Sequence, residues 1–196
     1  MKNISKFLIL FALGVVTFVG CDPDDEPPVV IPEGDYNHSG FITEDETWDA
    51  NGIHILKDRV VVKEGVTLTI APGAIIKGEA GAGVNATSLV IARGAKINAA
   101  GTADNPIIFT SIADEIALGE KAGVNLDAES AKGFWGGILI LGNAPVSPKT
   151  GTTEQIEGIP ASVAEGNYGG DDEEDNSGLL TYVSIRFGGA NIGEGN

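Results

Sequence analysis

The 196-residue sequence is poor in the residues from which most catalytic centres are built. It contains one cysteine, two histidines and two tryptophans, and only 6% of its residues are aromatic. The histidines, His38 and His54, stand apart in the sequence, and two isolated imidazoles do not make a metal or catalytic site. A Gly-x-Ser-x-Gly elbow, a Walker loop and a dinucleotide fingerprint are all absent from the sequence. No catalytic class therefore follows from a motif, and we assign no catalytic residue.

Basic side chains are scarce as well. The sequence has 12 Lys and Arg residues against 28 Asp and Glu residues, which gives a formal net charge of −16. Nucleic-acid binding needs clustered basic side chains that neutralise phosphates, so this composition argues against DNA or RNA as a partner. An acidic balance fits a soluble exported protein, or one that binds cations.

The sequence has one pronounced hydrophobic run, at its start. Lys2 and Lys6 precede an apolar segment from Phe7 to about Val16, and the small residue Gly20 follows. These are the three parts of an export signal. The run is too short to cross the ~30 Å hydrocarbon core of a bilayer comfortably, so a retained transmembrane helix is the weaker interpretation. We interpret residues 1–20 as a signal peptide.

The only cysteine directly follows this segment, in Phe18-Val19-Gly20-Cys21. The motif resembles the lipobox of bacterial lipoproteins, although Phe18 replaces the leucine usual at its position. The resemblance implies that Cys21 is acylated with diacylglycerol and palmitate and becomes the first mature residue. One acyl chain alone gives only marginal binding, at ~0.8 kcal/mol per buried methylene, so two or three chains would be needed for a stable membrane anchor. The alternative is a free thiol or an intermolecular disulfide.

Residues 21–40 differ from the rest in composition. They show no apolar periodicity, and they contain Pro23, Pro27, Pro28 and Pro32. Prolines fix φ and remove hydrogen-bond donors, which predicts an extended, solvated tether. An acidic cluster, Asp22, Asp24, Asp25 and Glu26, also resembles the surface-export signal of Bacteroidetes lipoproteins, which implies the outer face of the outer membrane. The alternative is that these acids only keep a linker extended and soluble.

Residues 41–196 carry an internal repeat at an offset of 21. Leu68, Ile70, Ala71, Gly73, Ala74 and Ile76 recur as Leu89, Ile91, Ala92, Gly94, Ala95 and Ile97. Short β-type runs with glycine corners at a period of about 20 residues are typical of a solenoid. We expect the repeated residues to lie on one another in successive coils, about 4.8 Å apart. A β-sandwich or Greek-key barrel also has short strands and glycine turns, but neither predicts such identities.

Further coils are expected at 106–111, 135–142 and 179–187, separated by long loops at about 112–133 and 143–178. In repeat proteins such insertions map to one face and often carry binding. The sequence stops at Asn196, shortly after an expected strand and without a polar cap. We therefore expect an open edge and further coils beyond this point.

Five segments together resemble a known family. They are GVTLTIAPGAIIKG, AAGTADNPIIFTS, GFWGGILILGNAPVS, QIEGIPAS and YGGDDEEDNSGLLTYVSIRFGGANIGEGN. They are similar to Bacteroidetes exported lipoproteins with right-handed parallel β-helices of the pectin-lyase-like kind. The resemblance covers most of residues 48–196. It implies an all-β, right-handed parallel β-helix, present here as an N-terminal portion, and an outer-membrane location, but it implies little about activity.

One loop could bind a metal ion. Five consecutive carboxylates, among them Asp171, Asp172, Glu174 and Asp175, lie between Gly170 and Asn176. Carboxylates with neighbouring Asn and Ser oxygens could supply the six to eight oxygen ligands of Ca²⁺, although the spacing is not that of an EF-hand. The alternative is a solvated acidic loop. Calcium is the only cofactor that the sequence suggests.

Three further side chains are candidates for ligand contact or chemistry. Trp48 and Trp135 could stack on sugar rings, or could instead cover the end or a corner of a core. The third is Arg186. β-Helices of the pectate-lyase type cleave acidic polysaccharide with Ca²⁺ and an Arg or Lys base, and the resemblance to them makes Arg186 a candidate for such a base. An ordinary surface arginine is the plainer interpretation, and fold analogy alone does not assign an enzyme.

These observations predict a lipid-anchored, exported β-helix that binds a glycan or another envelope protein. One alternative is a carbohydrate-active lyase or hydrolase whose site lies on further coils. A second alternative is a structural envelope protein without a ligand.

Overall fold

The computed structural model describes residues 35–127, 129–148 and 150–193. The predicted signal peptide, Cys21 and the proline-rich part of the tether lie outside these residues. Within the described ranges, no helix is long and apolar enough to cross a membrane. The helical content there consists of two short 3₁₀ segments, η1 (Gly83–Asn85) and η2 (Ala164–Gly166).

The strands follow one another as four successive coils of a parallel β-helix. The first coil comprises β1 (Asn37–Ile42), β2 (Glu46–Trp48) and the first half of β3 (Ile53–Val62). The second comprises the rest of β3, β4 (Thr67–Ile70) and β5 (Ile75–Gly78). The third comprises β6 (Ser88–Ile91), β7 (Lys96–Ala100) and β8 (Ile107–Ser111). The fourth comprises β9 (Gly137–Ile140), β12 (Gly178–Thr181) and β13 (Val183–Ile185).

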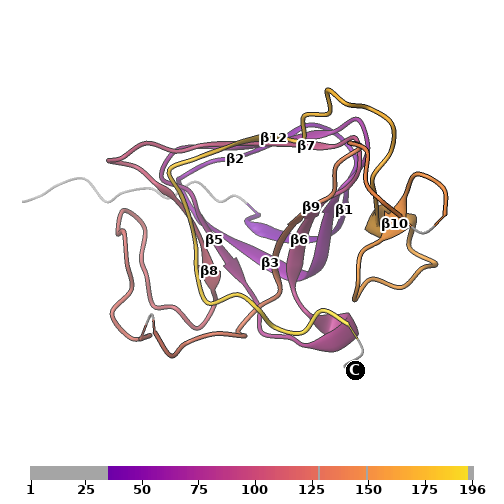
Figure 1. Ribbon diagram of the computed structural model, residues 1–196. Helices are drawn as coiled ribbons and strands as arrows, with labels where there is room; N and C mark the ends of the chain where they lie inside the picture. The colour runs from indigo at the N-terminus through magenta and orange to yellow at the C-terminus, as the bar shows by residue number, and fades with distance from the viewer. Residues whose placement is uncertain (1–34, 128, 149, 194–196) are drawn as a thin grey trace, which may run out of the picture. The chain divides into compact units, whose positions relative to one another are not determined.

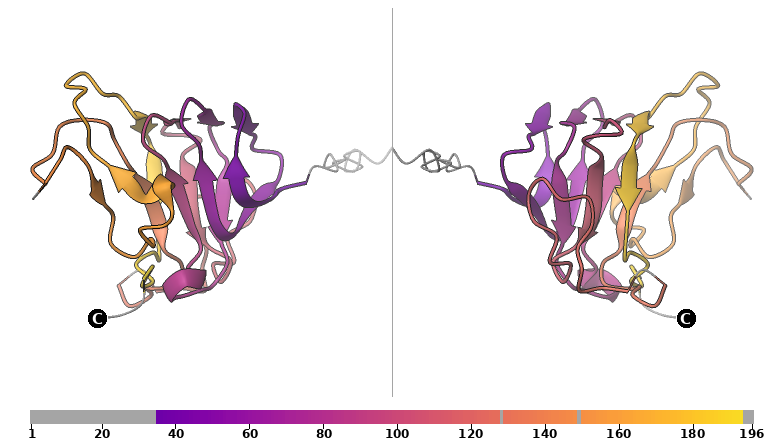
Figure 2. Two further views of the ribbon diagram at one scale, coloured as in Figure 1. Left: turned by 90° about the vertical axis from the view of Figure 1, so that its right-hand side faces the viewer. Right: turned by 90° about the vertical axis from the view of Figure 1, so that its left-hand side faces the viewer.

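Stacking of the coils makes three parallel faces around a triangular interior (Figure 1). Face A consists of the first half of β3, β5, β8 and β13. Face B consists of β1, the second half of β3, β6 and β9. Face C consists of β2, β4, β7 and β12. β3 serves two faces because the chain turns at Asp58, whose φ is 56°. Side views show the strands of successive coils lying next to one another (Figure 2).

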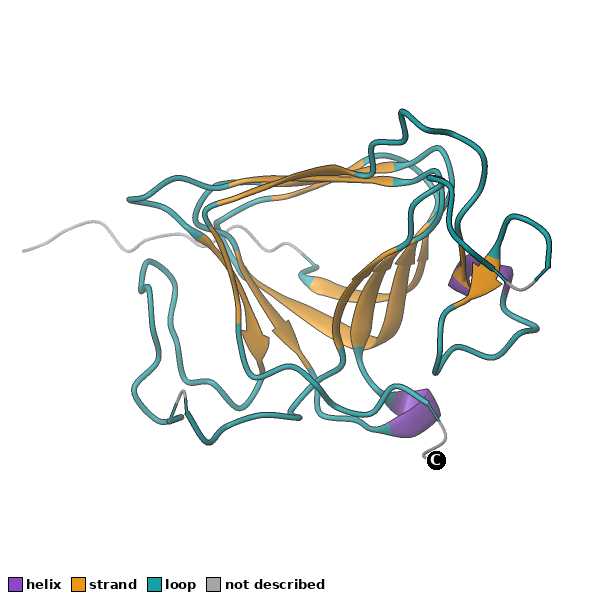
Figure 3. Cartoon of the chain, in the orientation of Figure 1, coloured by secondary structure: helices purple, strands orange, loops and turns teal. Residues whose placement is uncertain are grey.

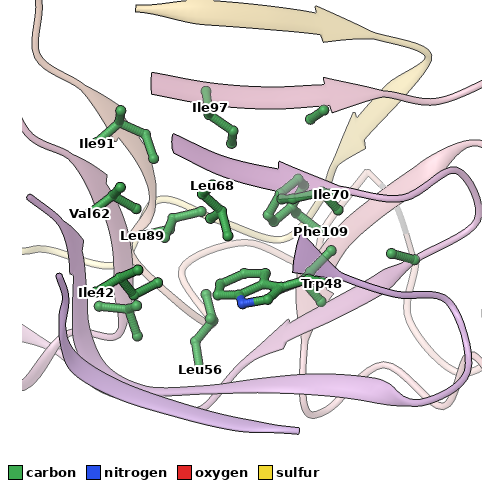
Figure 4. Packing of buried hydrophobic residues seen from close by; sticks show 14 of the residues in the cluster. Ile42, Trp48, Leu56, Val62, Leu68, Ile70, Leu89, Ile91, Ile97 and Phe109 are labelled. Carbon is green, nitrogen blue, oxygen red and sulfur yellow. The ribbon is translucent and has the colours of Figure 1, made fainter. Parts of the chain in front are cut away.

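The interior is filled by the alternating apolar residues of these strands. In β4, Leu68 and Ile70 are buried and Thr67 and Thr69 face outward, as the alternation in the sequence predicts. The buried cluster includes Ile42, Trp48, Leu56, Val62, Leu68, Ile70, Leu89, Ile91, Ile97 and Phe109 (Figure 4). Each fully buried Leu or Ile side chain contributes roughly 1.5–3 kcal/mol, so this interior is the main source of stability. The predicted all-β solenoid is confirmed.

The repeat at offset 21 does not mark stacked coils, and this prediction was wrong. Leu68 pairs with Ile97 rather than with Leu89, and Leu89 pairs with Val60 and Ile138. Vertical neighbours in the second and third coils are thus 29 residues apart on faces B and C, since 97 − 68 and 89 − 60 both equal 29, and 33 residues apart on face A, where Ile75 pairs with Ile108. Residues related by the repeat lie on adjacent faces of the triangle.

What recurs is a strand–corner–strand unit. Its corner is a turn in which the amide of the fourth residue donates to the carbonyl of the first: Ala74 to Ala71 at 3.1 Å, and Ala95 to Ala92 at 2.9 Å. The third residue of each turn is a glycine with positive φ, 85° at Gly73 and 77° at Gly94. An L side chain rarely adopts this φ, so glycine is required at both corners.

The long loops cover two different faces, not one as predicted (Figure 3). The loop after β8 packs Ile116 on Ile75 and Ile108 outside face A. It is fastened there by Lys77, whose Nζ donates to the carbonyls of Asp114 and Ile116 at 2.6 and 2.9 Å.

The segment between β9 and β12 covers face B. It contains η2 and an antiparallel pair, β10 (Glu154–Gln155) and β11 (Asn167–Tyr168). Its Ile159, with Ile156, Val163 and Tyr168 around it, packs over the outward side chains Val61 and Val90. Face C has no such cover: Thr47, Lys96 and Asn98 on its outer side are exposed.

Candidate functional site

The structure buries both candidate ligand-binding tryptophans. Trp48 is 2% exposed and Trp135 is fully buried. The indole Nε1 of Trp135 donates to the carbonyl of Arg186 at 2.8 Å, and its ring lies so close to Gly78 that a Cβ there would approach it to 2.9 Å. Both rings are buried, which favours the core interpretation of the sequence over the predicted ligand contacts.

The two histidines are not isolated, contrary to the prediction. β1 begins at Asn37, inside the segment assigned to the tether, and its pairing with β3 brings His38 beside His54. His38 Nε2 lies 2.8 Å from His54 Nδ1, and His54 Nε2 lies 2.9 Å from the carbonyl of Asp49. Because the carbonyl can only accept, His54 carries its proton on Nε2 and accepts from His38. Both rings stack on Trp48, with centroids 4.2 and 5.3 Å from it.

This polar layer closes the first coil. Burial, and the proximity of His54, lower the pKa of His38 to about 4, and burial also lowers the pKa of His54. Both imidazoles are therefore neutral near pH 7. A hollow of about 330 Å³ lies beside them, lined by Asp35, Tyr36, His38, Glu46, Thr47, Trp48, Asp49 and His54.

The carboxylates of the acidic loop do not converge on a common point. Asp171, Asp172 and Glu174 are exposed, whereas the Oδ2 of Asp175 accepts from the amide of Asn143 at 2.9 Å and from the hydroxyl of Ser177 at 3.3 Å. Among the described residues, no three His, Cys, Asp or Glu side chains converge as a metal site. The structure does not bring the four carboxylates together, and calcium binding by this loop stays a prediction.

The guanidinium of Arg186 is engaged by the protein itself. Its Nε donates to the hydroxyl of Ser184 at 2.9 Å, and its Nη2 donates to the carbonyl of Lys121 at 2.5 Å. These contacts tie the loop over face A to β13. Arg186 thus serves to position a loop, which agrees with the plainer of the two sequence interpretations.

A groove lies at the corner where face B turns into face C, and we call it the corner groove. It encloses about 280 Å³ and is lined by Lys63, Glu64, Ala92, Arg93, Ala164, Glu165 and Asn167. One wall consists of two corner turns from successive coils. These turns stack because the amide of Gly65 donates to the carbonyl of Gly94 at 3.0 Å.

The other wall of the corner groove comes from η2 and β11, about a hundred residues further along the chain. Two contacts hold it in place. Arg93 Nη1 donates to the carbonyl of Gly169 at 3.0 Å, and Lys63 Nζ forms an ion pair with Glu165 Oε1 at 2.5 Å. The hydrogen bond from Lys63, followed by that from its own backbone amide, lowers the pKa of Glu165. Glu165 is therefore ionised at neutral pH.

An exposed aromatic ring lies beside Lys63, one of the residues that line the groove. Phe41 is 57% exposed, and Lys63 Nζ lies 4.9 Å from the centroid of its ring. Phe41 is in register with Val61 on the outer side of face B. The segment that covers Val61, which is only 4% exposed, leaves Phe41 open. Large exposed aromatic rings beside polar groups are typical of binding sites.

The groove offers both donors and acceptors. Glu64 has no side-chain partner among the described residues, and Arg93 uses only Nη1 in a contact with them. Asn167 donates through Nδ2 to the carbonyl of Ala164 at 3.0 Å, which leaves its own side-chain oxygen to accept. Such a set, beside an apolar ring, suits a ligand rich in hydroxyl groups.

Sequence reasoning missed every residue of this site. The local signal was limited to glycine turns: Lys63 and Glu64 precede Gly65, and Arg93 precedes Gly94. Nothing in the sequence placed Glu165 beside Lys63.

Comparison with known proteins gives a family. Residues 40–196 match a family model described as a pectate-lyase-like beta helix domain. No curated protein and no solved structure matches the chain.

Proposed function

Because the chain belongs to the family of pectate-lyase-like β-helix domains, we propose that it is an envelope-anchored protein that binds a glycan in the corner groove. The observation that carries this proposal is the exposed ring of Phe41 beside a balanced set of donors and acceptors. A sugar has an apolar C–H face and a rim of hydroxyls. Phe41 suits the face, and the charged and amide groups of the groove suit the rim.

The electrostatics of the groove favour binding over hydrolysis. A glycoside hydrolase needs a carboxylic acid whose pKa is raised, so that it can protonate the leaving oxygen. The pKa of Glu165 is instead lowered, because Lys63 donates to its carboxylate. Glu165 is thus suited to accept a hydrogen bond from a hydroxyl group rather than to donate a proton.

The anchor is part of the same proposal. Cys21 directly follows the signal-like segment, and the acidic, proline-containing residues 22–34 separate it from the first described residue. We expect acylated Cys21 to hold the protein at the outer membrane. The change Cys21→Ser should move the protein from the membrane to the soluble fraction, and unchanged partitioning would contradict the anchor.

The binding proposal is tested with the whole protein, extracted from membranes in detergent and applied to an immobilised panel of polysaccharides. We expect at least one polysaccharide to bind, and Phe41→Ala to weaken that binding about tenfold, a loss of about 1.4 kcal/mol. Tyr182→Ala is the matched control, because Tyr182 is another exposed aromatic residue, 63% exposed, that lies outside the groove. Equal binding by the protein and its Phe41→Ala variant would overturn the assignment of the groove.

A further inference from the structure

The charges inside the corner groove cancel. Two cations, Lys63 and Arg93, face two carboxylates, Glu64 and Glu165, so their formal sum is zero. Lys63 already has a counter-ion, because its ammonium lies 2.5 Å from the Glu165 carboxylate. Glu64 lies along the second corner, because its Cγ is 3.0 Å from where a Cβ on Gly94 would stand, and Gly94 directly follows Arg93 in the sequence.

An acidic ligand would therefore gain little from these cations. To pair with Lys63, a ligand carboxylate would have to displace Glu165 or approach it as a like charge. To pair with Arg93, it would have to enter a groove that also contains the carboxylate of Glu64. Like charges at close range disfavour binding, and the effect grows where water is excluded.

The net charge of the whole chain also disfavours an acidic ligand. Residues 1–20 contain two lysines and no acids, so their removal changes the sum from 12 − 28 = −16 to 10 − 28 = −18. A field of this sign slows the approach of a polyanion and raises the local concentration of cations instead.

An uncharged glycan meets neither penalty. Each hydroxyl group both donates and accepts, so one hydroxyl can accept from Lys63 or Arg93 and donate to Glu64 or Glu165 without changing the charge balance. The volume of about 280 Å³ lies just below the range of ordinary ligand pockets, which starts at about 300 Å³, and so suits only a short stretch of glycan.

We propose that the corner groove selects uncharged glycan over acidic glycan. This inference rests on the proposed function and deepens it, since it names the class of ligand. It also departs from the family description, because pectate, named in that description, is a polyanion.

The test compares glycans in matched pairs that share a backbone and differ only in charge. Suitable pairs are oligogalacturonides with their methyl esters, and neutral glucans with their carboxylate-oxidised forms, each measured against the whole protein in detergent. We expect the neutral member of the bound pair to bind at least tenfold more tightly at low salt. The ratio should shrink at 0.5 M salt, where screening weakens the repulsion.

The outcomes separate the two proposals. Tighter binding of the carboxylate member would overturn the selection for uncharged glycan and leave glycan binding standing. Failure of every member to bind would overturn the proposed function, and the selection with it.

A charge-removing variant sharpens the test. Glu165→Gln removes the counter-ion of Lys63 and makes the groove net positive, so the preference for the neutral member should narrow by threefold or more. Glu115→Gln is the matched control, since it removes one exposed carboxylate outside the groove and changes the total charge equally. An unchanged preference in Glu165→Gln, or an equal narrowing in Glu115→Gln, would overturn the role assigned to the groove charges.

Discussion

The two ends of the described solenoid differ in the side chains that they place at interior positions. In the first coil, four inward positions hold polar or ring-bearing side chains, His38, Glu46, Trp48 and His54, and only Ile42 and Leu56 are aliphatic. In the fourth coil, the inward side chains of Ile140, Leu180 and Ile185 are 41%, 40% and 50% exposed.

This difference indicates how each end of the solenoid meets solvent. The polar groups of the first coil form hydrogen bonds with one another. His38 contacts His54, His54 contacts the carbonyl of Asp49, and Trp48 Nε1 donates to Glu46 Oε2 at 3.0 Å. Such a layer holds fewer aliphatic side chains than the fourth coil does. The fourth coil instead presents apolar side chains and strand edges paired on one side only, which can accept further strands.

The largest difference in stability between the two ends is expected from a change at Trp48. Trp48→Ala should lower the free energy of unfolding by about 3–5 kcal/mol, because a buried aromatic is replaced by a cavity. Ile185→Ala, at the other end, should cost less than about 1 kcal/mol, because half of that side chain already contacts solvent. Urea unfolding of both variants measures the difference. Similar losses would show that the two ends are closed alike.

Acid should weaken the first coil selectively. An unfolded histidine takes up a proton near pH 6.5, whereas His38 in the fold does so only near pH 4. Between these values the unfolded chain binds more protons, so stability is lost as the pH falls from about 6.5 towards 4. After discounting for the partial exposure of His38, we expect a loss of about 1–2 kcal/mol.

The change His38→Gln isolates this effect from the titration of carboxylates. The difference in urea midpoint between pH 7 and pH 5 should be smaller in the variant than in the unmodified protein. If both lose the same stability over this interval, the histidine layer does not carry the acid sensitivity.

The smallest effect on folding is expected at the exposed apolar end. Ile185→Lys should change the free energy of unfolding by less than about 0.5 kcal/mol, because the new ammonium can reach water. It should nevertheless reduce concentration-dependent association, since a charge on a strand edge discourages pairing. Sedimentation velocity in detergent over a range of concentrations measures this. Unchanged association would mean that this end does not mediate contacts.

The sequence predicted the strands well and their stacking poorly. Alternation in Val66–Ile70 and glycine at the corners indicated a solenoid, and both features are local. The offset of 21 misled because Leu68 and Leu89 occupy equivalent places in two strand–corner–strand units on adjacent faces. Which strands pair depends on how many residues make up a whole coil, and this number is 29 from β3 to β6 and from β4 to β7 but 33 from β5 to β8.

The candidate site could not be predicted for a related reason. Lys63 and Glu165 are 102 positions apart, and they meet only because the segment after β9 folds back over face B. Conversely, Trp48 and Trp135 were candidates because tryptophan often binds sugars. Whether such a ring faces a ligand or the core depends on which other segments pack against it. Exposure of Phe41 likewise follows from where the covering segment ends.

The sequence by itself determined the all-β solenoid and the net charge, because alternation, glycine corners and charge counts depend on neighbouring residues alone. Only the tertiary structure decided the coil register, the burial of the tryptophans, the pairing of His38 with His54 and the corner groove. These features depend on contacts between distant segments, whose relative positions are set by the lengths and packing of the intervening loops.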